Sequence, residues 1–223
     1  MKISEILNIT PGMTALIGGG GKTTLMYKLA DELSQSGTVI VCTSTKIVGP
    51  DDLTVLTGGS EEEIIAALKS SPVLCVGTRA DGRKLSAPLC GFSRLKELAD
   101  YVIVEADGAH RLPVKAHAAY EPVIPDGTDM TVLVIGADAF GRTVGEICHR
   151  PELFAAVAGV GTSSIVTPEV IKRVITAEGC GDRLYINKVE DNEAAASARQ
   201  LAAMLDMPVT AGSLKEEAYI CLR

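Results

Sequence analysis

The sequence predicts a three-layer α/β fold, with a mostly parallel sheet and helices on both of its faces. Short apolar runs alternate with amphipathic, helix-like segments along the chain, which is typical of repeated strand–helix units. The runs are rich in Val, Ile and Leu, as expected for strands that are buried on both faces. Apolar residues make up 47% of the 223 residues but aromatic residues only 4%, so the expected core is aliphatic. No repeat or linker divides the chain, and we expect one domain over residues 1–223.

Turn and capping residues set the boundaries of the individual elements. Ser60 and Glu63 form a capping box, Thr167 and Pro168 start a helix, and Gly179 ends it. Asp81-Gly82 predicts a hairpin turn. The predicted strands are Met13–Ile17, Thr38–Thr43, Leu53–Leu56, Val73–Gly77, Tyr101–Glu105, Thr131–Ile135, Leu184–Ile186 and Met207–Thr210. The predicted helices are Lys2–Ile9, Thr23–Gln35, Ser60–Ser70, Ser93–Ala99, Pro151–Val157, Thr167–Gly179 and Asn192–Leu205.

The glycine-rich segment Gly18–Thr24 is the strongest functional motif. It follows an apolar strand and opens a helix, which is the layout of a phosphate-binding loop. Glycines let the backbone turn several N–H groups onto one anion, and a helix N-terminus adds unpaired N–H groups. We expect Lys22 to reach the terminal phosphates of a nucleotide and Thr23 to bind Mg²⁺. The predicted phosphate-binding residues are Gly18, Gly19, Gly20, Gly21, Lys22, Thr23 and Thr24.

This loop is shorter than the usual one. The common motif has four residues between its first glycine and the Gly-Lys pair, and counting back from Gly21 places that first glycine at Leu16. If Gly18 is the first glycine, the loop lacks two residues, wraps fewer phosphate oxygens and is expected to bind nucleotide weakly. The alternative is a glycine-rich turn with an incidental lysine, but the flanking strand and helix favour the phosphate loop.

Two acidic residues follow the buried strand that ends at Glu105. In a parallel α/β sheet, ligands bind beyond the carboxyl ends of the strands, and Mg²⁺ needs carboxylates beside the phosphates. We therefore expect Glu105 to bind Mg²⁺ together with Thr23, and Asp107 to orient an attacking water. The predicted catalytic residues are Lys22, Glu105 and Asp107. The alternative at Asp107-Gly108 is an ordinary surface turn.

The segment Asn187–Asp191 follows a late strand and is similar to the Asn-Lys-x-Asp signature for guanine. A carboxylate there accepts the N–H donors of guanine, which adenine lacks, so the segment favours GTP over ATP. We expect Asn187, Lys188 and Glu190 to bind the base, with Asp191 as the alternative carboxylate. The later segment Ala211–Leu214 can pack its backbone against the base.

Other polar residues lie after strands or in the long loop 106–130, whose length indicates a functional segment. Thr43, Ser44, Thr45 and Lys46 suit Mg²⁺ or phosphate contacts, or form a polar turn. Further candidates for contacts with a second substrate or a protein partner are His110, Arg111, Lys115, His117, Arg142, His149 and Arg150. For any one of these residues, solvated loop charge is the simpler interpretation.

Composition excludes several classes of function. The net charge of −7 with no basic stripe argues against nucleic-acid binding, and no apolar run reaches the length of a membrane span. Without a signal-peptide pattern, we expect a cytoplasmic protein with free cysteines. The cysteines form no C-x-x-C pair and have no zinc-like spacing with the histidines; adjacent Cys148 and His149 are the one candidate half-site.

The chain resembles the YqeC family of selenium-dependent hydroxylase accessory proteins over nearly its whole length. The segments that carry the resemblance are Ile17–Thr24, Thr43–Ile47, Val104–Ala109, Lys115–His117, His149–Glu152, Thr167–Glu169 and Ile186–Val189. The resemblance implies a P-loop NTPase fold, in the branch that holds metallochaperone GTPases and dethiobiotin synthetase, with Glu105 ending the Walker B strand. It also implies a role in the maturation of selenium-dependent molybdenum hydroxylases of the xanthine dehydrogenase kind.

The motifs and the resemblance together predict a Mg²⁺-dependent hydrolase of GTP (or ATP) that drives insertion of a cofactor or of selenium into an apo-molybdenum hydroxylase. The motif set contains no arginine finger, so we expect slow turnover, with a partner or a second copy of the chain completing the site. One alternative is a small-molecule kinase with an acceptor pocket lined by His110, Arg111 and Lys115. The other is a scaffold that binds nucleotide without chemistry.

Overall fold

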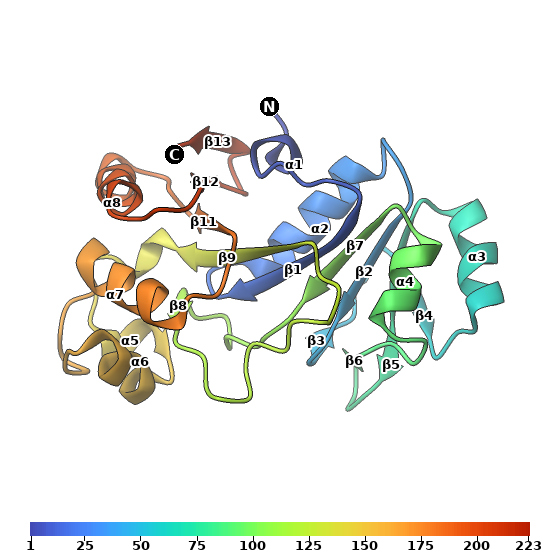
Figure 1. Cartoon of the computed structure of the whole chain (residues 1–223), viewed down its shortest axis with the longest axis horizontal. Coiled ribbons are helices and arrows are strands. Elements are labelled where there is room, and N and C mark those ends of the chain that lie inside the picture. The colour runs from blue at the N-terminus through green and yellow to red at the C-terminus, as the bar shows by residue number, and fades with distance from the viewer.

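The computed structural model describes all 223 residues and has an α/β architecture, in which helices flank a mixed, mostly parallel sheet (Figure 1). The strands are β1 (Gly12–Gly18), β2 (Val39–Thr43), β3 (Ile47–Val48), β4 (Thr54–Thr57), β5 (Val73–Arg79), β6 (Lys84–Ser86), β7 (Tyr101–Glu105), β8 (Val114–Lys115), β9 (Met130–Gly136), β10 (Cys148–His149), β11 (Arg183–Asn187), β12 (Val209–Ser213) and β13 (Ala218–Cys221). The helices are α1 (Ile3–Ile6), α2 (Lys22–Leu33), α3 (Glu61–Ser70), α4 (Phe92–Leu98), a 3₁₀ turn η1 (Ala137–Ala139), α5 (Val144–Ile147), α6 (Pro151–Ala158), α7 (Pro168–Glu178) and α8 (Asn192–Ala203).

The large sheet has 11 strands in the order β13-β12-β11-β9-β1-β7-β2-β5-β6-β3, with β4 also paired to β5. The pairs from β12 to β5 are parallel, and antiparallel pairs occur only where β13, β6 and β3 extend the sheet. Strand β1 lies between β7 and β9, with Leu16 opposite Glu105 and Gly18 opposite Val134. The carboxyl ends of these central strands therefore meet at one edge.

The alternation of side chains along the strands divides the core between the two faces of the sheet. On one face, Leu16 and its counterparts on neighbouring strands pack against α1 and α2. On the other face, Ala15 and Ile17 belong to a core with α5 to α8, and Met13 belongs to a smaller core with α3 and α4. Each central strand is thus covered on both faces, which explains its nearly continuous apolar sequence.

The predicted fold class is confirmed as an α/β fold with a mostly parallel sheet and helices on both faces. Every predicted strand and helix is present, and the boundaries shift by at most about three residues, a usual uncertainty for element ends. The Asp81-Gly82 turn joins the antiparallel strands β5 and β6, as predicted. None of the helices has the length and apolar character required to cross a membrane.

The structure also contains elements that the sequence pattern did not predict. The loop 106–130 includes β8, which pairs with β10 in a separate two-stranded sheet. These strands, like β3, have two residues each, so they are too short to show an alternation of apolar and polar residues. Edge strand β13 was also not predicted; its residues, Ala-Tyr-Ile-Cys, are apolar or aromatic but mostly exposed.

Candidate functional site

A cleft of about 1020 Å³ opens at the carboxyl edge of the central strands. Its floor is the turn from β1 to α2, and its walls come from the segment after β7, the segment after β2 and the start of the loop after β11. The lining residues are Gly19, Gly20, Gly21, Lys22, Thr23, Thr24, Thr45, Lys46, Ile47, Val48, Lys84, Glu105, Gly108, Ala109, His110, Arg111, Leu112, Glu121 and Lys188. The volume is at the upper end of the range typical of small-molecule pockets and suits a nucleoside triphosphate.

The cleft is cationic although the protein is acidic. The basic lining residues are Lys22, Lys46, Lys84, Arg111 and Lys188, whereas only Glu105 and Glu121 supply negative charge. The chain as a whole carries a formal charge of −7. Three of these cations are paired with carboxylates outside the lining, Lys22 with Asp107, Lys46 with Asp81 and Lys188 with Asp138. Lys84 and Arg111 remain, and basic groups in the lining of an acidic protein favour an anionic ligand there.

The glycine loop turns the chain sharply from β1 into α2. Gly18, Gly20 and Gly21 have φ angles of 94°, 71° and 126°, a region that residues with a side chain rarely adopt. The N–H groups of Gly19 and Gly20 donate to the carbonyls of Val134 and Leu112 at 2.8 and 3.0 Å. The Gly18 N–H also donates, to Asp107 Oδ2, so three loop amides are already engaged, in keeping with the short loop spacing.

The N-terminus of α2 remains open to the cleft. No side chain caps this helix, which begins at Lys22 after the left-handed Gly21. The first N–H groups of a helix lack intrahelical acceptors, so those of Lys22, Thr23 and Thr24 can receive an anion. All three residues line the cleft.

Replacing Gly20 with alanine is expected to lower the free energy of unfolding by about 3 kcal/mol, since overpacking adds to left-handed strain. The new Cβ would lie 2.2 Å from the backbone nitrogen of Gly136, so relief would require the backbone of β9 to shift. Gly82→Ala is the matched control, because Gly82 also has a positive φ but no atom within 4 Å of the added Cβ. Urea unfolding of both variants measures the difference, and equal losses would contradict the steric argument.

The predicted magnesium ligands Thr23 and Glu105 lie next to each other in the cleft. The Thr23 hydroxyl donates to Glu105 Oε2 at 2.7 Å, and Lys22 Nζ lies 3.9 Å from Glu105 Oε1. Burial raises the pKa of Glu105, and the nearby Lys22 and the Thr23 hydrogen bond oppose this shift. Two oxygen donors at the end of β7 and the start of α2 form a set that suits a hard cation such as Mg²⁺.

Asp107 lies beneath the glycine loop and does not line the cleft. Its side chain has no exposed surface. Its Oδ2 accepts hydrogen bonds from the Gly18 N–H at 2.8 Å and from His117 Nε2 at 2.7 Å, and its Oδ1 lies 2.9 Å from Lys22 Nζ. Lys22 also donates to the Gly18 carbonyl at 2.5 Å. In this arrangement the Asp107 carboxylate contacts the loop, Lys22 and His117, and it is not exposed to the cleft where we expected it to orient a water.

Several cations surround Asp107 and explain its ionisation. Burial alone would raise the pKa of Asp107, but the His117 hydrogen bond, Lys22 and Lys115 lower it to about 2. Lys115 Nζ lies 3.4 Å from Asp107 and 2.6 Å from Glu121, and its side chain is fully buried. From the sequence we expected His117 and Lys115 to contact a ligand. Both are far from the glycine loop along the chain, so the sequence gave no sign that they belong to this network.

The segment after β11 approaches the loop, but its side chains have different roles. Asn187 is buried and donates from Nδ2 to the Gly20 carbonyl at 2.8 Å. Lys188 lines the cleft and pairs with Asp138 at 2.6 Å. Glu190 is exposed and accepts from the Ser213 hydroxyl at 2.9 Å, while Asp191 caps α8 by accepting from the Ala194 N–H at 2.8 Å. Of the predicted base-binding residues, the structure places only Lys188 in the lining.

The other polar residues that we proposed from the sequence also fall into two groups, inside and outside the lining of the cleft. Thr45, Lys46, His110 and Arg111 line the cleft, so an arginine that the motif set did not reveal is present there. Thr43 and Ser44 instead bond to backbone carbonyls, and Arg150 pairs with Glu121 at 2.5 Å. Arg142 is exposed, away from the lining.

The proposed half-site at Cys148 and His149 gathers no further ligands. Cys148 is buried, and the ring of His149 lies against that of His110, with 4.5 Å between the centroids. The side chains that lie close enough together to bind a metal ion are instead those of His117, Glu178 and Cys180. All six cysteines are free.

Fold and site together define an α/β protein with a glycine-rich strand-to-helix turn facing a cationic cleft at the carboxyl edge of its sheet. The chain belongs to the YqeC family, because the family model described as "YqeC protein" matches residues 14–152. It is also 24% identical over 238 residues to a relative named "Uncharacterized protein YqeC" from Escherichia coli (strain K12), covering 96% of this chain and 91% of that protein. The matched region includes the glycine loop, Glu105 and the whole loop 106–130.

Proposed function

We propose that this protein binds a nucleoside triphosphate with Mg²⁺ in the cleft and hydrolyses it slowly, as a P-loop NTPase. The observation that carries the proposal is the uncapped N-terminus of α2, which opens with Lys22 into a cationic cleft. The phosphates would lie on the N–H groups of Lys22, Thr23 and Thr24, and the positive end of the helix dipole would favour them. Lys22 would neutralise charge on the transferring phosphoryl group.

The metal would be held by Thr23 and Glu105. Their hydroxyl and carboxylate oxygens are 2.7 Å apart at the floor of the cleft, directly after Lys22 and at the end of β7. An Mg²⁺ ion bound there would neutralise part of the negative charge on the phosphates. Asp107 would hold Lys22 and the loop in place rather than contact water, because both of its oxygens face protein groups.

The base would lie toward the segment after β11, and we propose GTP as the preferred nucleotide, with ATP as the alternative. Lys188 lines the cleft and Asn187 holds Gly20, so this segment is adjacent to the phosphate loop. Glu190 remains the candidate carboxylate for the guanine N–H donors, since its side chain is exposed whereas Asp191 is engaged as a helix cap. Discrimination would come from donors left unpaired when adenine replaces guanine.

The proposed cellular role is assistance in maturing a selenium-dependent molybdenum hydroxylase. Membership of the YqeC family supports this role, through the resemblance on which the expectation was based. The partner would be the apo-hydroxylase or another maturation protein in the cytoplasm, or a second copy of the chain would complete the site. Release of inorganic phosphate from GTP tests the proposal: slow release that the apo-hydroxylase accelerates is the expected result. If GTP stays intact both with and without the apo-hydroxylase, the protein is a scaffold that binds nucleotide without hydrolysing it.

Replacing Glu105 with glutamine is expected to remove most of the Mg²⁺ dependence of nucleotide binding. Glutamine keeps the hydrogen bond from Thr23 but loses the charge that a hard cation requires. We expect the wild-type protein to bind GTP more tightly with Mg²⁺ than with EDTA. The ratio of these two affinities should fall at least tenfold in the variant. Glu61→Gln is the control, because Glu61 is a partly exposed partner of Arg94 outside the cleft. An unchanged ratio in Glu105→Gln would exclude Glu105 as a ligand.

A small-molecule kinase is the second candidate. His110 and Arg111 line the cleft beyond the glycine loop, and both have left-handed φ angles of 50° and 65°, which are strained for such residues. An acceptor bound between these side chains and the terminal phosphate would be phosphorylated in place of water. The third residue of the expected pocket, Lys115, is buried in ion pairs and does not line it. Transfer of phosphate from GTP to an added pterin, with no free phosphate released, would favour the kinase.

A further inference from the structure

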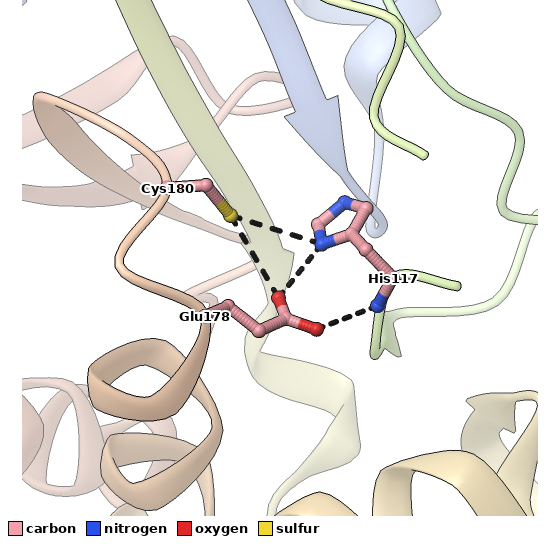
Figure 2. A group of neighbouring side chains, drawn as sticks. All are labelled: His117, Glu178 and Cys180. Atoms are coloured by element: carbon pink, nitrogen blue, oxygen red, sulfur yellow. Dashed lines mark hydrogen bonds and ion pairs between the residues drawn. The ribbon is translucent and has the colours of Figure 1, made fainter. Parts of the chain in front are cut away.

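Three side chains of metal-ligand type meet behind the glycine loop, outside the cleft. His117 follows β8, Glu178 is the last residue of α7, and Cys180 comes two residues later. Figure 2 shows the three side chains pointing toward one another from these two separate segments. His117 Nδ1 lies 2.7 Å from Glu178 Oε2, and Cys180 Sγ lies 3.8 Å from each of these two atoms.

The end of α7 brings Glu178 and Cys180 to the same side. Gly179 adopts a left-handed conformation, with φ 58°, and its N–H donates to the Ile175 carbonyl, so the helix stops there and the chain reverses. The backbone N–H of His117 donates to Glu178 Oε1 at 2.6 Å, which ties the loop after β8 to the helix end (Figure 2). The turn at Gly179 and the bond from the His117 N–H to the Glu178 carboxylate therefore bring the three side chains together.

We propose that His117, Glu178 and Cys180 bind a thiophilic divalent cation of the Zn²⁺ type. Tetrahedral bonds of about 2.3 Å to sulfur and 2.0 Å to nitrogen or oxygen separate the sulfur from the other donors by about 3.5 Å. The sulfur is 3.8 Å from each partner here, so the cation requires mainly that His117 and Glu178 move apart from 2.7 Å. Three protein ligands leave a fourth position for water or a substrate group.

The donor set selects the kind of ion. A thiolate and an imidazole bind Zn²⁺, Co²⁺ or similar ions strongly, whereas Mg²⁺ and Ca²⁺ prefer oxygen donors. The three residues are partly buried, with 4% of the His117 side chain and 13% of the Glu178 side chain exposed. The group is therefore largely shielded from solvent, and it is chemically distinct from the oxygen pair Thr23 and Glu105.

The environment of His117 matches that of a metal-binding histidine. Its Nε2 lies 2.7 Å from Asp107 Oδ2, on the side of the ring away from Glu178 and Cys180. A carboxylate in this position fixes the ring orientation and the tautomer, leaving Nδ1 for the cation. Asp107 also holds the Gly18 N–H and Lys22, so the metal site and the glycine loop share one carboxylate.

Titration of the apo-protein with Co²⁺, in the absence of nucleotide, tests the site. We expect one Co²⁺ per chain, with a near-ultraviolet sulfur-to-cobalt charge-transfer band that one equivalent of Zn²⁺ removes. Cys180→Ser is expected to lose the band and to weaken Zn²⁺ binding at least a hundredfold. Cys90→Ser is the matched control, since Cys90 is also free and partly buried but lies elsewhere, and it should keep both.

Glu178→Gln gives a second, independent test, with an expected loss of at least tenfold in Zn²⁺ affinity measured by calorimetry. Far-ultraviolet circular dichroism confirms that each variant is folded. The proposal is overturned if Co²⁺ binds without the sulfur band, if Cys180→Ser retains that band, or if Cys90→Ser loses it equally. Because no nucleotide is present, these outcomes are independent of the proposed NTPase function.

Discussion

Asp107→Asn is expected to lower the free energy of unfolding by about 3–5 kcal/mol, the usual loss when one partner of a buried ion pair is removed. The Asp107 side chain is fully buried and faces Lys22, Lys115 and His117 at 2.9, 3.4 and 2.7 Å. Asparagine has nearly the same shape but no charge, so Lys22 keeps only Glu105, 3.9 Å away, as an acidic neighbour, while Lys115 and His117 keep Glu121 and Glu178. The backbone of Gly18 would also lose a charged acceptor.

Urea unfolding at neutral pH measures this effect, with Glu217→Gln as the matched control. Glu217 pairs with Lys28 at 2.5 Å, but 65% of its side chain is exposed, so its loss should lower the unfolding free energy by no more than about 1 kcal/mol. A comparable, small loss in both variants would show that Asp107 does not hold the network under the glycine loop together.

Lys22→Ala is expected to weaken nucleotide binding at least a hundredfold. Lys22 is the basic group closest to the open N-terminus of α2, and its Nζ is held between the Gly18 carbonyl and Asp107. Asp107 keeps Lys115 and His117 as partners in the variant, so we expect the fold to persist. The loss would therefore report the missing contact with phosphate.

Lys28→Ala provides the control for charge, because Lys28 lies on the same helix, outside the cleft, and pairs with Glu217. Its affinity for nucleotide should match that of wild type. Calorimetric titration of both folded variants with GTP and Mg²⁺ makes the comparison. Micromolar affinity retained in Lys22→Ala would remove Lys22 from the phosphate site and leave the glycine loop as a structural turn.

Local sequence signals predicted most of the fold because the relevant interactions are short in range. The capping box at Ser60 and Glu63 and the cap at Thr167 start helices in the structure as predicted. The strand that ends at Glu105 has the same boundaries as β7, since a fully buried strand has a distinct apolar pattern. The glycine loop lies between a strand and a helix, at the carboxyl edge where sequence order alone would place a ligand.

The parts that were not predicted depend on contacts between distant residues. His117 meets Asp107 across the loop that contains β8, and a strand of two residues has no readable period from which this path could be predicted. Glu178 and Cys180 are more than 60 positions from His117, and spacing rules for metal ligands apply to neighbours in sequence. We expected Asp107 to orient a water, but its side chain faces protein groups. The sequence shows that Asp107 follows a strand, but it does not show which way the side chain points.

Calorimetric titration of the wild-type protein with GTP and with ATP, each with Mg²⁺, tests most directly whether the cleft is a nucleotide site. We predict saturable binding of both, tighter for GTP, and loss of the GTP preference in Glu190→Gln. Asp191→Asn should keep the preference, because asparagine also caps a helix well. Absence of binding by either nucleotide at millimolar concentration would contradict the account, and equal affinities in wild type would contradict the assignment of guanine.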